Sequence, residues 1–181
     1  DLIPNTIDTP KAIYVSTFDS APLAPDLSFV IEQNKTAFDK GLEVLNALSA
    51  GNLHVGLSSG SSLSVAVGDA TEFSGPHPAG NVGIQIHHTN ALKSGEKVWY
   101  IDVQDVIILG KLFTTGEYHA ERIIALTGSE VNNPKYIKAR VGQSLTSIFA
   151  ESVSNGNVRY IQGNVLTGAL SHKEDFLSFY T

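Results

Sequence analysis

The sequence contains no cysteine, and this absence removes several kinds of site. Disulfides, cysteine-held zinc and iron–sulfur clusters all need cysteine ligands, so this chain forms none of them. The lack of cysteine also suits a reducing compartment. Methionine is absent too, even at the first position, which is Asp1. We therefore expect a processed chain or a piece of a longer protein.

Long hydrophobic runs and basic clusters are missing as well. The longest aliphatic run covers residues 106–109, whereas a membrane-spanning helix needs about 20 apolar residues. No signal peptide is visible, and we predict no membrane span. Lys and Arg number 12 against 18 Asp and Glu, for a net charge of −6. An acidic chain without a basic cluster is not expected to bind nucleic acid or anionic lipid directly.

The chain has 181 residues, which is enough for one ordinary domain or for one domain and part of another. Apolar periodicity in the first two thirds predicts strands alternating with helices. The expected strands are 11–17, 53–57, 97–101 and 122–126, and the expected helices are 31–49, 78–88 and 102–116. Strand, helix and strand in succession are typical of a βαβ unit. The first part is therefore predicted to be α/β.

The pattern changes near Thr127, where we place a domain boundary. Beyond it we expect strands at 136–141 and 158–161, a short helix at 144–151, and turns at 132–134 and 155–156. This part is predicted to be a small β-grasp unit with one short helix. The predicted domains are 1–127 and 128–181, with the latter holding all or part of the second domain.

Four sequence landmarks occur in a fixed order along the chain. They are 75–80 (GPHPAG), 104–107 with 110–117, 131–134 with 142–145, and 165–168. Together they resemble the family of A subunits of the bacterial Na+-translocating NADH:quinone reductase, and the resemblance extends from about residue 11 to residue 168. Members of that family are longer than this chain, so the resemblance implies an internal fragment.

The resemblance also implies a fold and a role. The middle of the family is distantly similar to the flavin-binding subunit of respiratory complex I, which has an α/β Rossmann-like domain followed by an α+β β-grasp domain of the soluble-ligand-binding type. Members of the family are associated with quinone and hold no flavin or iron–sulfur centre. The implied role is a peripheral, cofactor-free subunit on the cytoplasmic side of the bacterial inner membrane. Its complex would couple NADH oxidation by quinone to Na+ export, with NADH, flavins and Fe–S on partner subunits.

Chemistry-bearing residues are sparse, and we assign none of them to catalysis or metal binding. No G-x-G-x-x-G follows the first expected strand, and the loop 58–62 lacks the lysine of a phosphate-binding loop, so flavin and nucleotide binding are not expected. His87 and His88 are adjacent and would point in different directions, which suits a metal poorly. Asp102 and Asp105 fit a helix cap and first turn better than a pair of catalytic carboxylates.

The segment 75–80 is the best candidate site for a ligand. Glycines surround His77, and Pro78 suits the first position of a helix, whose unpaired N–H groups could hold an anion or a quinone head group. We predict quinone contacts from His77, Pro78 and Gly80, and from Phe18 in the turn after the first strand. The alternative is a tight strand-to-helix turn that needs small residues and prolines for structural reasons.

Two other functions stay open on the sequence. One is a stand-alone flavin- or NADH-binding reductase domain, which visible absorbance would reveal. The other is a purely structural interaction module, which would bind partners with no effect of quinone.

Overall fold

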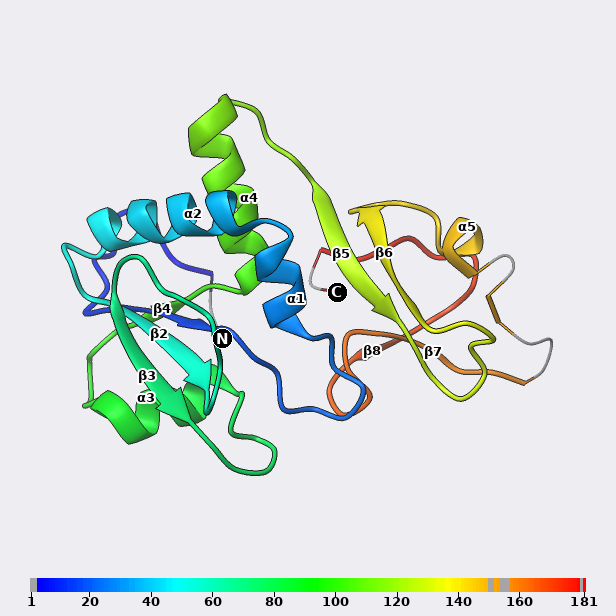
Figure 1. The fold of residues 1–181 in the computed structure, drawn as a ribbon, viewed down its shortest axis with the longest axis horizontal. Helices are drawn as coiled ribbons and strands as arrows, with labels where there is room; N and C mark the ends of the chain where they lie inside the picture. Colours follow the sequence, from blue (N-terminus) through cyan, green and yellow to red (C-terminus); the bar gives the residue numbers. More distant parts are fainter. Residues whose placement is uncertain (1–2, 150–151, 154–156, 180) are drawn as a thin grey trace. The chain divides into compact units, whose positions relative to one another are not determined.

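The computed structural model describes residues 3–149, 152–153, 157–179 and 181, which form two compact units (Figure 1). The first unit comprises Asp1–Ser20 and Asp26–His119, and the second comprises Ala21–Pro25 and Ala120–Thr181. The division thus lies at His119, not near Thr127. The reason is β5 (Glu121–Leu126), which pairs along its whole length with β6 (Lys135–Arg140) and so belongs to the second unit.

The first unit is built on a four-stranded parallel sheet with the strand order β3-β2-β1-β4. Its strands are β1 (Ile13–Ser16), β2 (Leu53–Ser58), β3 (Asp69–Phe73) and β4 (Trp99–Tyr100). The α/β prediction is confirmed, as are three of its strands. The strand β3 was not predicted, because its sequence DATEF carries two carboxylates and lies largely exposed at an edge of the sheet.

The predicted single helix over 31–49 is wrong, because two helices occupy this region. They are α1 (Leu27–Glu32) and α2 (Lys35–Leu48). The side chain of Asp26 caps α1 by accepting hydrogen bonds from the N–H groups of Ser28 and Phe29. At the other end, the Asn34 side chain donates to the carbonyl of Val30 and closes α1 before α2 begins.

Helices cover both faces of the sheet. Figure 1 shows α2 and α4 (Val103–Thr115) on one side and α3 (Val82–Asn90) on the other. The strand β1 is buried on both sides, as expected for the centre of a parallel sheet. Ala12 and Tyr14 pack with Ile86 of α3, so the alternate residues Ile13 and Val15 face α2 and α4.

The helix α4 ends as predicted, at Gly116. This residue has a positive φ of 78°, and its N–H donates to the carbonyl of Leu112. Such a left-handed residue is a common end of a helix, and glycine adopts it at the least cost.

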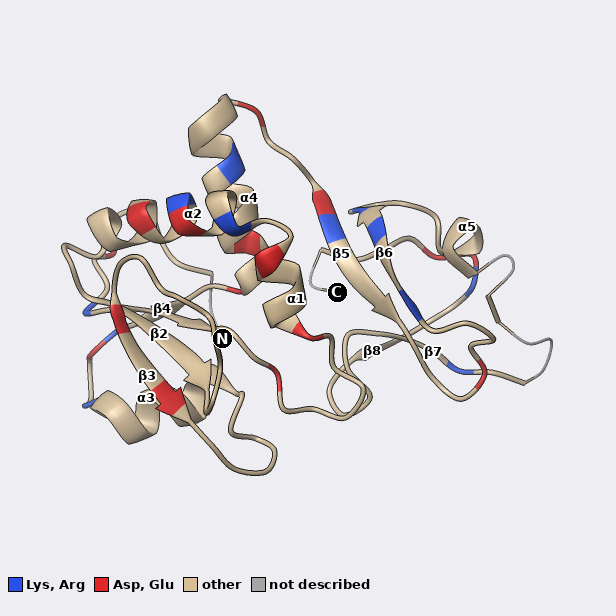
Figure 2. Cartoon of the chain, in the orientation of Figure 1, with Lys and Arg blue, Asp and Glu red and all other residues tan. Residues whose placement is uncertain are grey.

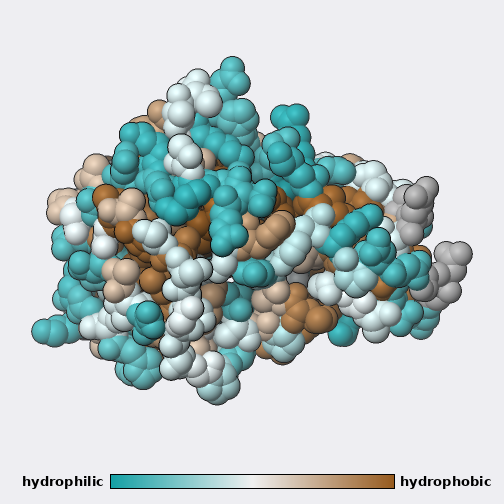
Figure 3. Space-filling model, viewed as in Figure 1, coloured by the Kyte–Doolittle hydropathy of each residue, from teal (hydrophilic) through white to brown (hydrophobic). Residues whose placement is uncertain are grey.

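The outward side of α2 is a charged surface that faces solvent. Lys35 pairs with Asp39, and Lys40 with Glu43, along one turn of the helix each. Figure 2 shows these alternating charges on α2, and Figure 3 shows hydrophilic residues over the same helix. Exposed pairs of this kind contribute only a few tenths of a kcal/mol each, roughly 0.3–0.5.

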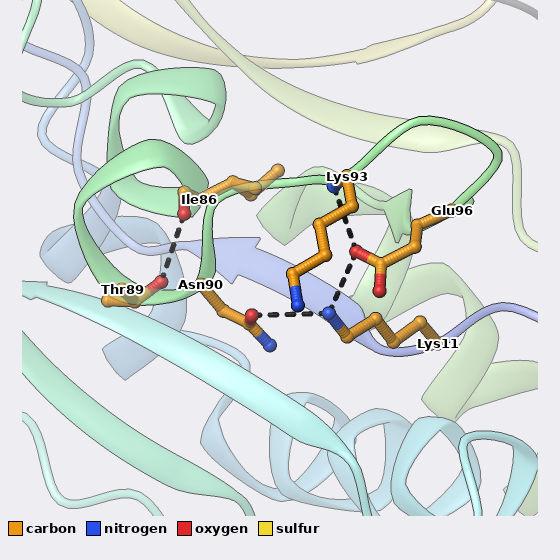
Figure 4. A network of polar contacts seen from close by, with 6 residues as sticks. All are labelled: Lys11, Ile86, Thr89, Asn90, Lys93 and Glu96. Carbon is orange, nitrogen blue, oxygen red and sulfur yellow. Dashed lines mark hydrogen bonds and ion pairs between the residues drawn. The ribbon is translucent and has the colours of Figure 1, made fainter.

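A polar clamp fixes the loop after α3 to the start of β1 (Figure 4). The carboxylate of Glu96 accepts hydrogen bonds from the backbone N–H of Lys93 at 3.0 Å and from Nζ of Lys11 at 2.9 Å. The same Lys11 ammonium donates to Asn90 of α3 at 3.2 Å. The Lys93 N–H, and then Lys11, hold the pKa of Glu96 below its usual value of 4.5. The clamp therefore positions α3 and β4 relative to β1.

The described residues of the second unit form two antiparallel strand pairs and a short helix. β5 pairs with β6, and β7 (Tyr160–Gln162) pairs with β8 (Ala169–Ser171). The helix predicted at 144–151 is present as α5 (Leu145–Phe149), and the predicted turn at 155–156 lies outside the described residues. A separate core holds the unit together, made of Ala139, Leu145, Ile148 and Leu177.

Candidate functional site

Two loops of the first unit meet at the carboxyl end of β1. One loop follows β1 and contains Phe18 and Ser20, and the other precedes α3 and contains His77 and Gly80. Side chains from both loops form a connected hydrogen-bond network with β1 and α3. We call it the β1-end cluster, and its members are Ser16, Phe18, Ser20, His77, Gly80 and Gln85.

The inner part of the cluster is centred on Ser16, the last residue of β1. Its hydroxyl lies 3.0 Å from both the Phe18 and the Gly80 carbonyls, which share its one proton, and it accepts from Nε2 of Gln85 at 2.8 Å. Gln85 is almost fully buried on α3, and its Nε2 also donates to the Ala79 carbonyl at 3.3 Å. A buried amide must be hydrogen-bonded, so Gln85 ties the end of β1 and the loop before α3 to the helix.

The outer part of the cluster reaches solvent through His77. The backbone N–H of Gly80 donates to the Ser20 hydroxyl at 2.9 Å, and that hydroxyl lies 3.1 Å from Nδ1 of His77. His77 itself is exposed. A chain of hydrogen bonds therefore links an exposed imidazole to the backbone of a buried glycine.

Gly80 permits the close approach of the two loops. A Cβ built on it would lie 2.6 Å from the Ser20 nitrogen, 2.9 Å from the Phe18 oxygen and 3.0 Å from the Asp19 Cα. These atoms all belong to the backbone, which cannot move aside as a side chain can. Position 80 therefore requires glycine for packing. This agrees with the alternative interpretation of the segment, a tight turn that needs small residues for structural reasons.

Pro78 does not occupy the first turn of a helix, so that prediction is wrong. The helix α3 begins at Val82, and Asn81 is its N-cap, with a side chain that accepts from the N–H of Gly83. Pro78 lies four residues before the helix, is exposed, and follows His77 through a cis peptide bond. The helix starts later because Asn81, with its short side-chain oxygen, is the residue able to cap it.

The structure brings all four predicted quinone residues together at one end of the sheet. Phe18 is half-buried, Gly80 is buried, and His77 and Pro78 are exposed beside them. Ser16, Ser20 and Gln85 were not predicted. Serine in a loop and glutamine in a helix carry no signal of their own, because their roles depend on which loops the sheet order brings together.

The other residues considered for chemistry lie apart from the cluster. His87 and His88 contact each other edge to face on α3, with ring centroids 5.4 Å apart. Asp102 occupies the N-cap position of α4 and Asp105 its first turn, as predicted. Within the described residues, no three His, Asp or Glu side chains are grouped in a way that could hold a metal ion.

A hollow lies at the opposite, amino end of the sheet. It has a volume of about 370 Å³ and is lined by residues 9–11 and 95–97. Its charged side chains already pair with one another or with a neighbour, Lys11 with Glu96 and Lys97 with Asp8. In the β1-end cluster, by contrast, the imidazole of His77 is exposed.

The location of the cluster is one that open parallel sheets commonly use. β1 lies between β2 and β4, so the chain first adds β2 and β3 on one side of β1 and later adds β4 on the other side. Such sheets bind ligands beyond the carboxyl ends of their strands, at the point where the strand order reverses. The cluster can offer an exposed hydrogen-bond donor there, which suits a ligand with a carbonyl oxygen. In the described part of the chain, no helix is both long and apolar enough to cross a membrane.

Comparison with known families matches each unit of the chain to a domain of the same family. Residues 1–118 match the family model described as the NqrA second alpha/beta domain. Residues 123–173 match the model described as the NQRA C-terminal domain. The gap between the two matches contains the division at His119 that the structure shows.

Similar curated proteins share one name, which makes them A subunits of the Na(+)-translocating NADH-quinone reductase. The protein of Pasteurella multocida (strain Pm70) is 39% identical over 170 residues, which are 92% of this chain and 38% of the relative. That of Klebsiella pneumoniae subsp. pneumoniae is 42% identical over 167 residues, 91% of this chain and 37% of the relative. That of Yersinia pseudotuberculosis serotype O:1b is 41% identical over 162 residues, 88% of this chain and 36% of the relative. The chain thus spans somewhat more than a third of the length of these relatives.

Proposed function

This chain belongs to the NqrA family, as its sequence landmarks predicted, and we propose that it is a non-catalytic part of a Na+-translocating NADH:quinone reductase. In this proposal it is a peripheral segment of a longer NqrA chain, and its partners are the other subunits. The complex, as a whole, is the enzyme: it oxidises NADH with quinone and exports Na+. The support is the name that the relatives share.

We further propose that the two units are a Rossmann-like domain and a β-grasp domain of the soluble-ligand-binding type. The strand order β3-β2-β1-β4 supports the first, because the classic doubly wound order, 3-2-1-4-5-6, contains it. The antiparallel pairs around the short helix α5 support the second. Fold alone does not bring cofactor binding with it.

The chain is proposed to bind no cofactor, with NADH, flavins and Fe–S held by partner subunits. The loop after β1 reads TFDSAP, which lacks the glycines that let a pyrophosphate approach the backbone. The purified chain should therefore be colourless. A stoichiometric flavin spectrum or bound iron would contradict this part of the proposal and favour a reductase domain.

We propose the cytoplasmic side of the bacterial inner membrane as its location, attached through partner subunits. The relatives come from bacteria, and the absence of cysteine suits a reducing compartment. Co-purification of the chain with the membrane-bound partners, and its release when those partners are removed, would test this attachment.

The quinone contact is proposed at the β1-end cluster. His77 supplies a donor to the quinone carbonyl, with Phe18, Pro78 and Gly80 beside it. The observation that carries the proposal is the exposed imidazole of His77, whose Nδ1 contacts the Ser20 hydroxyl at the carboxyl end of β1. A quinone carbonyl accepts hydrogen bonds and has no proton of its own, which matches such a donor.

The test is labelling by a photoreactive ubiquinone analogue, with and without the partner subunits. His77→Ala should weaken the labelling of this segment and leave the melting temperature nearly unchanged, since one exposed hydrogen bond is worth about 0.5–1.5 kcal/mol. His172→Ala, an exposed histidine of the second unit, is the matched control. Labelling that persists in His77→Ala would remove this cluster as a quinone site. Partner binding without any quinone effect would favour a purely structural module.

A further inference from the structure

The hydroxyl of Ser20 lies between the Gly80 N–H and the His77 ring of the β1-end cluster, and these two groups restrict the direction of its hydrogen bonds. It accepts a hydrogen bond from the Gly80 N–H at 2.9 Å and lies 3.1 Å from Nδ1 of His77. Within the described part of the chain, Ser20 has no other hydrogen-bond partner for its side chain. A hydroxyl has a single proton to donate. It also has two acceptor lone pairs, of which the Gly80 N–H uses one, and Nδ1 of His77 is the acceptor among the described residues that lies within reach of its proton.

Gly80 cannot move away to change this arrangement. Its carbonyl accepts from the Ser16 hydroxyl at 3.0 Å, and its Cα lies against the backbone of the loop after β1. Ser16 is in turn held by the buried amide of Gln85. The Gly80 N–H thus stays directed at Ser20, and the proton of the Ser20 hydroxyl stays directed away from it.

The tautomer of His77 is linked to the direction of its Nδ1 bond: an Nδ1 without a proton accepts from Ser20, whereas an Nδ1–H donates to it. A neutral imidazole carries one proton, and the nitrogen that accepts a hydrogen bond is the one without it. Which nitrogen carries the proton is commonly set by the bond that the other nitrogen makes. In the first of these arrangements, in which Nδ1 accepts from Ser20, the proton is on Nε2, at the far side of an exposed ring. His77 then faces a ligand as a donor.

We propose that Ser20 is a positioning residue that holds His77 as an Nε2–H donor and thereby makes the β1-end cluster selective for oxidised quinone over quinol. The inference rests on the quinone contact proposed above. The carbonyl oxygen of a quinone only accepts, so it matches the donor. A quinol hydroxyl brings a proton of its own to the contact, and its oxygen is the poorer acceptor.

The positioning role is tested without any ligand, by 15N NMR of the histidine rings in the full chain at a pH where they are neutral. His77→Gln identifies the His77 signals. We expect the Nε2–H form to dominate in the unsubstituted chain, and its ratio to the Nδ1–H form to fall about two- to ten-fold in Ser20→Ala. Ser20→Thr keeps the hydroxyl and should keep the ratio.

Thr115→Val is the matched control, because it removes a hydroxyl that lies 3.4 Å from a nitrogen of another histidine, His119. It should leave the His77 signals in place. An Nδ1–H form in the unsubstituted chain, or a ratio that Ser20→Ala leaves unchanged, would overturn the positioning role, even in a chain that binds quinone.

The selectivity is tested by competition against the photoreactive ubiquinone analogue. Unlabelled ubiquinone should compete better than ubiquinol, and this preference should fall about two- to ten-fold in Ser20→Ala and persist in Ser20→Thr. Equal competition by both forms in the unsubstituted chain would overturn the selectivity. No labelling of the chain at all would overturn the quinone contact and the selectivity with it, whereas the NMR ratio would still decide the role of Ser20.

Discussion

Gly110 of α4 lies against the backbone of Gly41 in α2, and a Cβ built on Gly110 would be 2.8 Å from the Gly41 nitrogen. The same Cβ would overlap the carbonyl of Ala37. On the other side of the contact, a Cβ on Gly41 would lie 2.7 Å from Cγ1 of Val106. Two glycines thus let the helices cross at close range, and this crossing covers one face of the sheet that carries the β1-end cluster.

Gly110→Ala should therefore lower the free energy of unfolding by about 1–3 kcal/mol, although alanine is the better helix former. The added methyl group meets backbone atoms, which cannot rotate away. Urea unfolding followed by circular dichroism measures the change. Lys111→Ala, at the next position of α4, is the control and should stay within about 0.5 kcal/mol of the unsubstituted chain. A Gly110→Ala chain as stable as this control would show that the two helices do not pack so closely.

Gly80→Val should destabilise the first unit by about 1–3 kcal/mol, because its Cβ would meet backbone atoms of the loop after β1. Gly83→Ala is the control on α3, where the nearest atom to a new Cβ is the Asn81 Oδ1 at 3.3 Å. Differential scanning calorimetry of both variants separates the two positions. If Gly80→Val melted at the temperature of Gly83→Ala, the glycine would not be required by packing.

Much of the first unit could be predicted from local patterns. β1 and β2 are short runs of apolar and β-branched residues, and a glycine marks the end of α4. β3 could not be predicted this way, since its residues are largely exposed and two of them are acidic. The break at Asn34 was also missed, because apolar residues continue at helical spacing from α1 into α2 and mask the end of the first helix.

The candidate site was only partly predictable, for a different reason. A glycine- and proline-rich turn around His77 is visible in the sequence, but its partner loop is 57 residues away. Ser16 and Gln85 are 69 residues apart, and only the parallel sheet with α3 packed on it brings them within 2.8 Å. No local periodicity encodes such a contact. The start of α3 depends on the cap at Asn81, which the glycines and prolines around His77 did not indicate.

Acid should weaken the first unit through Glu96. Hydrogen bonds from the Lys93 N–H and then from Lys11 lower the pKa of Glu96 below 4.5 in the folded chain. A carboxylate with a lowered folded pKa stabilises the fold above its unfolded pKa, and this contribution is lost as the pH falls through the folded value. Glu96→Gln should therefore reduce stability at pH 7 and flatten the loss of stability below pH 4.5.

Thermal melts between pH 7 and pH 3 measure this effect, with Glu43→Gln on α2 as the control for loss of one carboxylate. The two variants should differ most at neutral pH and converge on the unsubstituted chain in acid. A Glu96→Gln chain with the same acid dependence as the unsubstituted chain would mean that the clamp between Lys11 and Glu96 contributes nothing to folding.

The Tyr14 hydroxyl is buried on the α3 side of the sheet and has no hydrogen-bond partner among the described residues. Its ring stacks on the His54 imidazole, with centroids 4.8 Å apart, and this contact does not need the hydroxyl. Burying an unpaired hydroxyl costs about 1–3 kcal/mol, so Tyr14→Phe should raise the free energy of unfolding by about 1 kcal/mol. Urea unfolding tests this, with the exposed Tyr118→Phe as the neutral control. A Tyr14→Phe chain less stable than the Tyr118→Phe chain would mean that the hydroxyl does bond inside the folded unit, most simply to a buried water molecule.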